Sequence, residues 1–365
     1  MAFPASHKTV FLLDHSNALF SQTTEEIEIE SIKSSSQSGF PPVNKISKSI
    51  WTSATESVLE YARIVWDIFP PSSEDWNEHK LIRIALFNER ECTKFFPSWD
   101  RKHQTAVSLA NDLAKMAGRP PMTSNKFGGA GKLREKLRRG VRAALELLIE
   151  NSEAQEYVKK KDASLLVNAG RIVCITHAED LQAFTEDFTS ILEHEMIEIN
   201  PNAASASNLS SLSKIDVHVV CCYSNLATPN QIPLEEIKRQ VSHSINFVVT
   251  KVPGGMELSK LFLEMALNHF DLASTTVTGI PMKEEQNASS SANYDVELFH
   301  KASAHWRLLS DSLEKNKGYN DLSNWMPQTA KEGFRYNTIT LKWCTPRGSS
   351  ADLHNCSLIA RYVIN

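Results

Sequence analysis

Asp14 and Ser16 are the residues whose types and spacing most clearly suggest chemistry in this sequence. They follow the apolar run from Lys8 to Leu13, which predicts a central strand of a covered, mostly parallel sheet. Open sheets of this kind bind ligands at the carboxyl ends of their strands. A carboxylate and a hydroxyl there suit Mg²⁺, a hard cation that prefers oxygen ligands. The pair is a candidate metal site, and a turn that merely ends the strand is the simpler interpretation.

The residues from Asp14 to Ala18 resemble Asp-x-Ser-x-Ser, the metal-site signature of von Willebrand factor A domains. Two expected oxygen ligands are missing, however. The third position is Ala18, and Thr176 is followed by His177 and Ala178, where an intact site carries Asp-Gly. We therefore expect a degenerate site and assign no metal and no cofactor. A metal-dependent binding module that uses Asp14 and Ser16 remains the alternative.

A run of basic residues marks the helix predicted over residues 132–150. Such a helix can contact phosphates, which makes a weak RNA contact one hypothesis. A solvated helix face is the favoured alternative, because no aromatic side chains for base stacking are interleaved with the charges. The candidate contacts are Lys132, Arg134, Arg138 and Arg139.

The sequence contains no pattern that recommends an enzyme. It has no Gly-x-Ser-x-Gly elbow and no His-Glu-x-x-His motif, and Gly128–Lys132 lacks the spacing of a phosphate-binding loop. Because catalytic triads are spatial, an unrecognised hydrolase stays a third hypothesis. We assign no catalytic residue.

Composition narrows the class of protein. The 365 residues predict about two domains. Lys and Arg number 39 against 43 Asp and Glu, a net charge of −4 that does not fit a polybasic membrane binder. No apolar run is long enough for a membrane helix, and no secretion signal is expected. The six cysteines form no Cys-x-x-Cys pair, which favours a reducing compartment.

The elements that would position these residues alternate between strands and helices. Apolar periodicity predicts a helix over 46–69, a strand over 81–87 and, beyond the Gly- and Pro-rich insertion 118–131, the basic helix. Further strands are expected over 171–176, 217–223 and 245–251, followed by a helix that ends near 270. This order predicts a doubly wound α/β domain over residues 1–270.

The pattern changes after residue 271. Residues 274–278 are β-rich, and 337–344 and part of 353–363 alternate with period two. We expect a second, all-β and barrel-like unit over 271–365 that is not complete at its end. The open strand edge of such a unit invites pairing with another chain. Tyr294, Phe299 and Trp343 are candidate partner-binding residues, with ordinary core packing as the alternative.

Several long and unusual blocks lie at 6–11, 46–52, 170–176, 269–276, 280–286, 291–298 and 338–347. In sequence and in order these blocks resemble the Asunder family, the thirteenth subunit of the Integrator complex. The resemblance implies a von Willebrand A-like domain followed by a β-barrel, in a protein of about twice this length.

The resemblance also implies a function. The expected role is a non-catalytic scaffold that pairs with the fourteenth and tenth Integrator subunits. Integrator trims nascent small nuclear RNAs and attenuates transcription, with its nuclease in another subunit. Family links to dynein recruitment, mitosis and sperm development imply possible dynein-associated partners and a location in nucleus and cytoplasm.

Overall fold

The computed structural model describes residues 2–28, 45–95, 99–117, 130–224, 235–283 and 291–302. The chain divides into two compact units, residues 1–263 and 264–365. The division lies inside a helix, a few residues before the boundary expected at 270. Because most of the second unit falls outside the described residues, the boundary at 270 stays a prediction.

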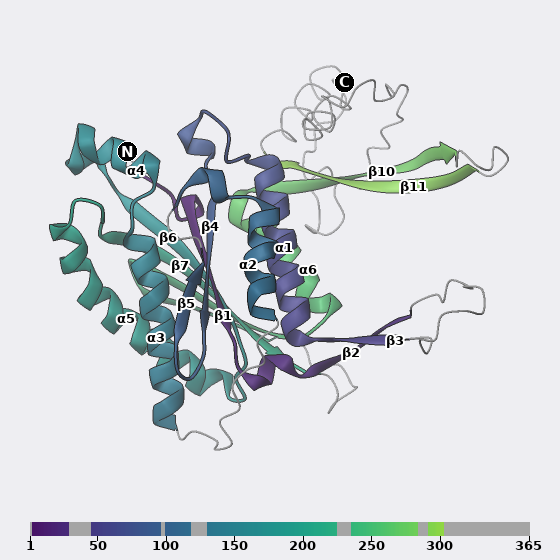
Figure 1. The fold of residues 1–365 in the computed structure, drawn as a ribbon, viewed down its shortest axis with the longest axis horizontal. Coiled ribbons are helices and arrows are strands. Elements are labelled where there is room, and N and C mark those ends of the chain that lie inside the picture. Colours follow the sequence, from purple (N-terminus) through teal and green to yellow (C-terminus); the bar gives the residue numbers. More distant parts are fainter. Residues whose placement is uncertain are drawn as a thin grey trace, which may run out of the picture. The chain divides into compact units, whose positions relative to one another are not determined.

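A seven-stranded sheet in the order β5-β4-β1-β6-β7-β9-β8 forms the centre of the first unit (Figure 1). The five inner strands run parallel, and the two edge strands are antiparallel to their neighbours. The inner strands are β4 (Leu81–Phe87), β1 (Lys8–Asp14), β6 (Asn168–Thr176), β7 (Leu212–Tyr223) and β9 (Ile245–Pro253). The edge strands are β5 (Cys92–Phe95) and β8 (Glu235–Ser242). The predicted α/β class with a mostly parallel sheet is confirmed.

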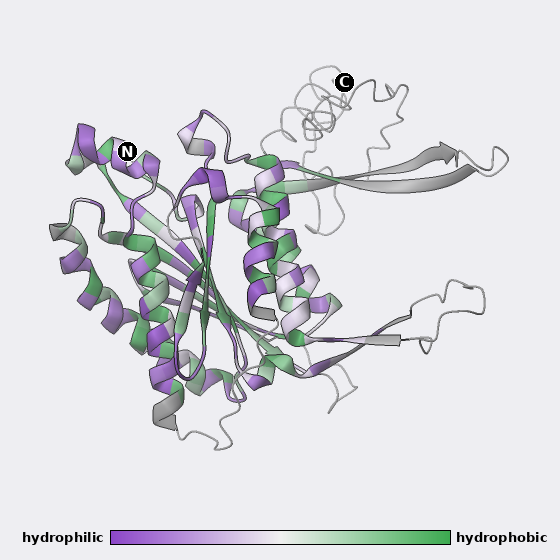
Figure 2. Cartoon of the chain, in the orientation of Figure 1, coloured by the Kyte–Doolittle hydropathy of each residue, from purple (hydrophilic) through white to green (hydrophobic). Residues whose placement is uncertain are grey.

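Helices cover both faces of this sheet, which is why β1 is apolar on both sides. Val10 and Leu12 belong to the core cluster formed with α3 (Ala130–Ile149) and α5 (Leu181–Ser205). On the other face, the Phe11 ring lies 5.0 Å from the Tyr61 ring and 6.1 Å from the Phe262 ring. Those rings belong to α1 (Ile50–Ile68) and α6 (Met256–Phe270), and α2 (Ala106–Ala117) lies beside α1. Figure 2 shows the central strands largely in the hydrophobic colour and α3 and α5 in both colours.

The short helix α4 (Glu153–Lys161) follows α3 and begins at a capping box. The Ser152 hydroxyl accepts from the Gln155 backbone N–H, and the Gln155 side chain accepts from the Ser152 backbone N–H. No helix among the described residues is long and apolar enough to cross a membrane.

The helix predicted over 46–69 begins at Ile50 instead, so the first part of this prediction is wrong. Residues Lys45–Ser49 form β3, which pairs with β2 (Gln22–Glu28) in an antiparallel ribbon that the sequence analysis missed. The Ser49 hydroxyl caps α1 by accepting from the Thr52 backbone N–H at 3.1 Å. The helices α2, α4 and α5 were not predicted either.

The described part of the second unit contains an antiparallel hairpin, β10 (Leu272–Lys283) and β11 (Ser291–Lys301). The β-rich segment 274–278 lies within β10, as predicted. Its pairing register shifts between Val277 and Ile280. The strands expected over 337–344 and 353–363, and with them the barrel, lie outside the described residues.

Candidate functional site

The carboxyl end of β1 lies at the point where the order of strands along the sheet reverses. The chain places β4 on one side of β1 and then β6 on the other, and such a switch point is where α/β sheets bind ligands. Asp14 is the last residue of β1 and lies opposite Phe87 of β4. Thr176 ends β6 on the other side. Asp14 therefore lies at the carboxyl end of the first strand, as predicted, while ligand binding at this edge stays a prediction.

Asp14 is buried, with a side chain that is 1% exposed, and it is paired with a lysine from α3. Its Oδ2 accepts a hydrogen bond from Lys136 Nζ at 2.7 Å and another from Thr176 Oγ1 at 2.7 Å. Its Oδ1 has no hydrogen-bond partner among the described residues. The Lys136 side chain is only 9% exposed. This is a buried ion pair, and removal of one partner of such a pair costs about 3–5 kcal/mol.

Helix α3 approaches the same edge through two further contacts. Gly140 lies one turn after Lys136 and packs on the Phe87 ring so closely that a Cβ there would be 2.9 Å from it. The Lys136 ammonium also lies 5.5 Å from the centroid of that ring. Arg139 donates to the backbone carbonyl oxygens of Asn88 and Glu89 at 3.4 and 3.0 Å. Together these contacts fix the middle of α3 against the ends of β1 and β4.

Ser16 follows the strand but makes no side-chain cap to the short 3₁₀ helix Asn17–Phe20 that it precedes. His177 Nδ1 donates to the carbonyl of Cys222 at 2.8 Å, because a carbonyl oxygen can only accept. The described residues contain no group of three or more His, Cys, Asp or Glu side chains that could hold a metal ion. Because Asp14 is already paired with an ammonium, the donor set at this edge does not fit a divalent cation.

His15 is a buried neighbour of this edge that the sequence analysis did not single out. Its ring packs edge-on against Phe20 and Trp51, at centroid distances of 5.1 and 5.0 Å. Its backbone N–H donates to the carbonyl of Phe87. Burial lowers the pKa of His15, and the adjacent Asp14 carboxylate opposes that shift. Burial therefore favours the neutral imidazole.

The arginines of the basic run are paired with groups of the same chain. Arg134 forms an ion pair with Asp187 at 2.5 Å, and Arg138 forms one with Glu195 at 2.6 Å. Glu195 is fully buried and is shared with Arg142 at 3.3 Å. The side chain of Lys132 lies outside the described residues.

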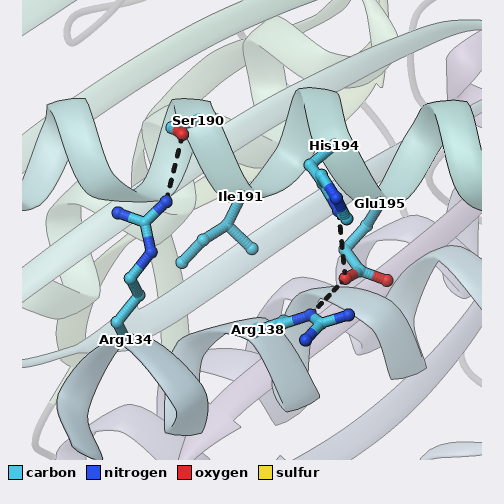
Figure 3. Close-up of a pocket in the computed structure, with 6 residues that line it drawn as sticks. All are labelled: Arg134, Arg138, Ser190, Ile191, His194 and Glu195. Atoms are coloured by element: carbon cyan, nitrogen blue, oxygen red, sulfur yellow. Dashed lines mark hydrogen bonds and ion pairs between the residues drawn. The ribbon is translucent and has the colours of Figure 1, made fainter. Parts of the chain in front are cut away.

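A pocket of about 220 Å³ separates α3 and α5 at this point (Figure 3). It is lined by Arg134, Arg138, Ser190, Ile191, His194 and Glu195. Arg134 donates to the Ser190 hydroxyl at 3.2 Å, so both arginines of the lining bond to α5. The hypothesis that this helix contacts RNA stays a prediction, and any phosphate would compete with these internal partners.

A serine and a histidine do meet elsewhere in the first unit. His7 Nε2 lies 2.8 Å from Ser152 Oγ, and His7 Nδ1 donates to the carbonyl of His79 at 3.0 Å. Ser152 is 1% exposed, and its hydroxyl also caps α4. Burial, reinforced by the charge of Lys8, lowers the pKa of His7 to about 3. This arrangement holds a helix start in place and leaves the hydroxyl out of reach of a substrate.

The candidate partner-binding residues lie in the second unit. Tyr294 and Phe299 are in β11, opposite Ile280 and Ser274 of β10. Phe299 is partly exposed. Trp343 lies outside the described residues, so partner binding by these side chains stays a prediction.

Comparison with known proteins identifies the family. Residues 3–363 match the family described as "Cell cycle and development regulator Mat89Bb". The chain belongs to this family. Members similar to it include "Integrator complex subunit 13" of Xenopus tropicalis and of Homo sapiens, 32% and 31% identical over 358 residues each. "Protein asunder" of Drosophila willistoni is 32% identical over 363 residues.

These Mat89Bb relatives are longer than the chain. The matches cover 97% of the chain and 47%, 47% and 49% of the three relatives, so the chain spans about half of their length. The resemblance to the Asunder family predicted from the sequence is confirmed.

Proposed function

We propose that this chain is a non-catalytic scaffold subunit of the Integrator complex that supports 3′-end processing of small nuclear RNA and regulation of transcription. The observation that carries the proposal is its similarity, along 97% of its length, to proteins named Integrator complex subunit 13. The family links to dynein localisation, mitosis and spermatogenesis extend the proposal to roles in both nucleus and cytoplasm.

The state of the reactive side chains supports a scaffold over an enzyme. Asp14 is held by Lys136 and Thr176, and the Ser152 hydroxyl is buried beneath His7. Burial raises the pKa of Cys221 to about 12, which keeps that thiol protonated and a poor nucleophile.

We further propose a von Willebrand A type for the α/β unit and a barrel-like β unit for residues 271–365. The β10–β11 hairpin supports the second part, because a two-stranded hairpin alone is marginally stable and needs further strands. The fourteenth and tenth Integrator subunits are the proposed partners.

A pull-down from nuclear extract of the source organism tests the proposal. Tagged residues 1–365 should recover the fourteenth and tenth subunits, identified by mass spectrometry. Phe299→Ala should weaken this recovery. Tyr157→Ala, which removes a half-exposed aromatic from α4, should leave it unchanged. A stable, monomeric chain that recovers neither subunit would contradict the proposal.

A further inference from the structure

The buried pair at the end of β1 places a cation beside a carboxylate, as a metal site does, but the cation is the Lys136 ammonium. Asp14 brings one full negative charge to the switch point of the sheet, where its side chain is 1% exposed. A buried carboxylate is costly unless a cation and hydrogen-bond donors compensate it. The Lys136 ammonium at 2.7 Å and the Thr176 hydroxyl at 2.7 Å supply both.

The ammonium differs from a divalent cation in two respects that matter for binding. A metal held by oxygen ligands at a sheet edge keeps open coordination positions for an outside ligand. The Lys136 ammonium is instead carried on a side chain that is 9% exposed and already donates to Asp14. Burial therefore leaves a carboxylate from another molecule little access to this charge.

Lys136 comes from α3, so the charge is part of the packing between that helix and the sheet. Phe87 lies beneath the ammonium, with the centroid of its ring 5.5 Å away, and Gly140 packs on the same ring. A metal ion could replace this cation only by displacing a side chain whose backbone lies in α3 and whose ammonium donates to Asp14.

We propose that Lys136 is the resident cation of this edge. It takes the place of a divalent metal, ties α3 to Asp14 of β1, and makes the α/β unit independent of metal ions. Without it, Asp14 Oδ2 would lose its cation while Oδ1 already has no partner, and the space vacated by the lysine would lie beside Thr176. Those oxygens would then accept a small hard cation.

Thermal unfolding with millimolar Mn²⁺ or with EDTA tests the proposal on the full chain. The wild-type melting temperature should be the same in both solutions. Lys136→Ala should melt lower than wild type in EDTA and recover about 2–4 °C or more in Mn²⁺. Adding Asp14→Asn to Lys136→Ala should abolish that recovery. A rise in the wild-type melting temperature with Mn²⁺ that Asp14→Asn removes would overturn the proposal, as would a folded Lys136→Ala that ignores Mn²⁺.

A second set of variants applies even if Lys136→Ala does not fold. Lys136→Met keeps the length of the side chain and removes only its charge. Asp14→Asn combined with Lys136→Met should melt higher than Lys136→Met alone, because the pair of substitutions leaves no unpaired charge. Lys94→Met is the matched control, since Lys94 pairs with Glu146 at 2.5 Å but is 33% exposed, and it should change the melting temperature little. A combined variant no higher than Lys136→Met would contradict the proposal.

Discussion

Acidification should destabilise this protein through His7, and His7→Asn should remove that part of the effect. The imidazole is 2% exposed and lies between the His79 carbonyl and the Ser152 hydroxyl. Burial, with the nearby charges of Lys8 and Lys80, lowers its pKa from 6.5 to about 3. Between these values the unfolded chain binds the proton and the folded chain does not. The free energy of unfolding therefore falls as the pH drops from 6.5 toward 3. Above pH 6.5 the stabilising contribution of neutral His7 is fully present.

The magnitude follows from the size of this pKa shift. Each pH unit in the window costs about 1.4 kcal/mol, so His7 accounts for a loss of about 2 kcal/mol between pH 7.5 and pH 5 and about 5 kcal/mol over the whole window. Asparagine can still donate to the His79 carbonyl but does not titrate. Urea unfolding followed by tryptophan fluorescence at the two pH values measures the difference.

The control for His7→Asn is His103→Asn, which changes an imidazole that is 55% exposed. The loss of stability on acidification should be about 2 kcal/mol smaller in His7→Asn than in wild type and in the control. His218, whose pKa burial lowers to about 4, acts in the same direction and leaves a residual pH dependence in all three proteins. Equal losses in His7→Asn and wild type would refute the reasoning.

Three further outcomes are expected. Gly140→Ala should destabilise the protein by about 1–3 kcal/mol in urea unfolding despite the better helix propensity of alanine, because the new Cβ would lie 2.9 Å from the Phe87 ring. Cys221, with a pKa of about 12, should stay unlabelled by iodoacetamide at pH 8 until the chain is unfolded, as peptide mass mapping would show. If Arg134 and Arg138 contact phosphates, replacing both with Ala should reduce the slope of log binding constant against log salt concentration for RNA by about 2. An unchanged slope would mean that these arginines bind only their partners in α5.

The central strands were predictable because burial on both faces leaves a continuous apolar run. The strand expected from Lys8 is β1 as predicted, and those expected at 81 and 171 correspond to β4 and β6. Helix α5 was missed for a physical reason. Its fully buried Glu195 lies where an apolar side chain would be expected, because Arg138 and Arg142 neutralise it across the helix contact. A periodicity based on apolar residues does not register such a position.

The site was predictable only in part. The position of Asp14 at the sheet edge follows from local sequence, but its partner Lys136 is 122 residues away in the chain. In the sequence, Lys136 is one of several basic residues on a helix, and neither its burial nor its target is encoded locally. The β2–β3 ribbon was missed in the same way, because Lys45–Ser49 continues the periodicity of the following helix but is bound to Gln22–Glu28.

The contacts that the charged side chains of α3 make within the chain bear on how this unit can bind other molecules. Along one helix, Lys136 neutralises a sheet edge, Arg138 neutralises a buried glutamate and Arg139 binds backbone carbonyls. Several charges of the run are therefore compensated by partners in the same chain, although the side chains of Arg134 and Arg138 are 51% and 45% exposed. A metal ion at the end of β1 would bind a carboxylate from another molecule, whereas the Lys136 ammonium is paired with Asp14 and its side chain is only 9% exposed. If the chain is the scaffold proposed above, the hairpin that carries Tyr294 and Phe299 is the first surface to test for partner binding.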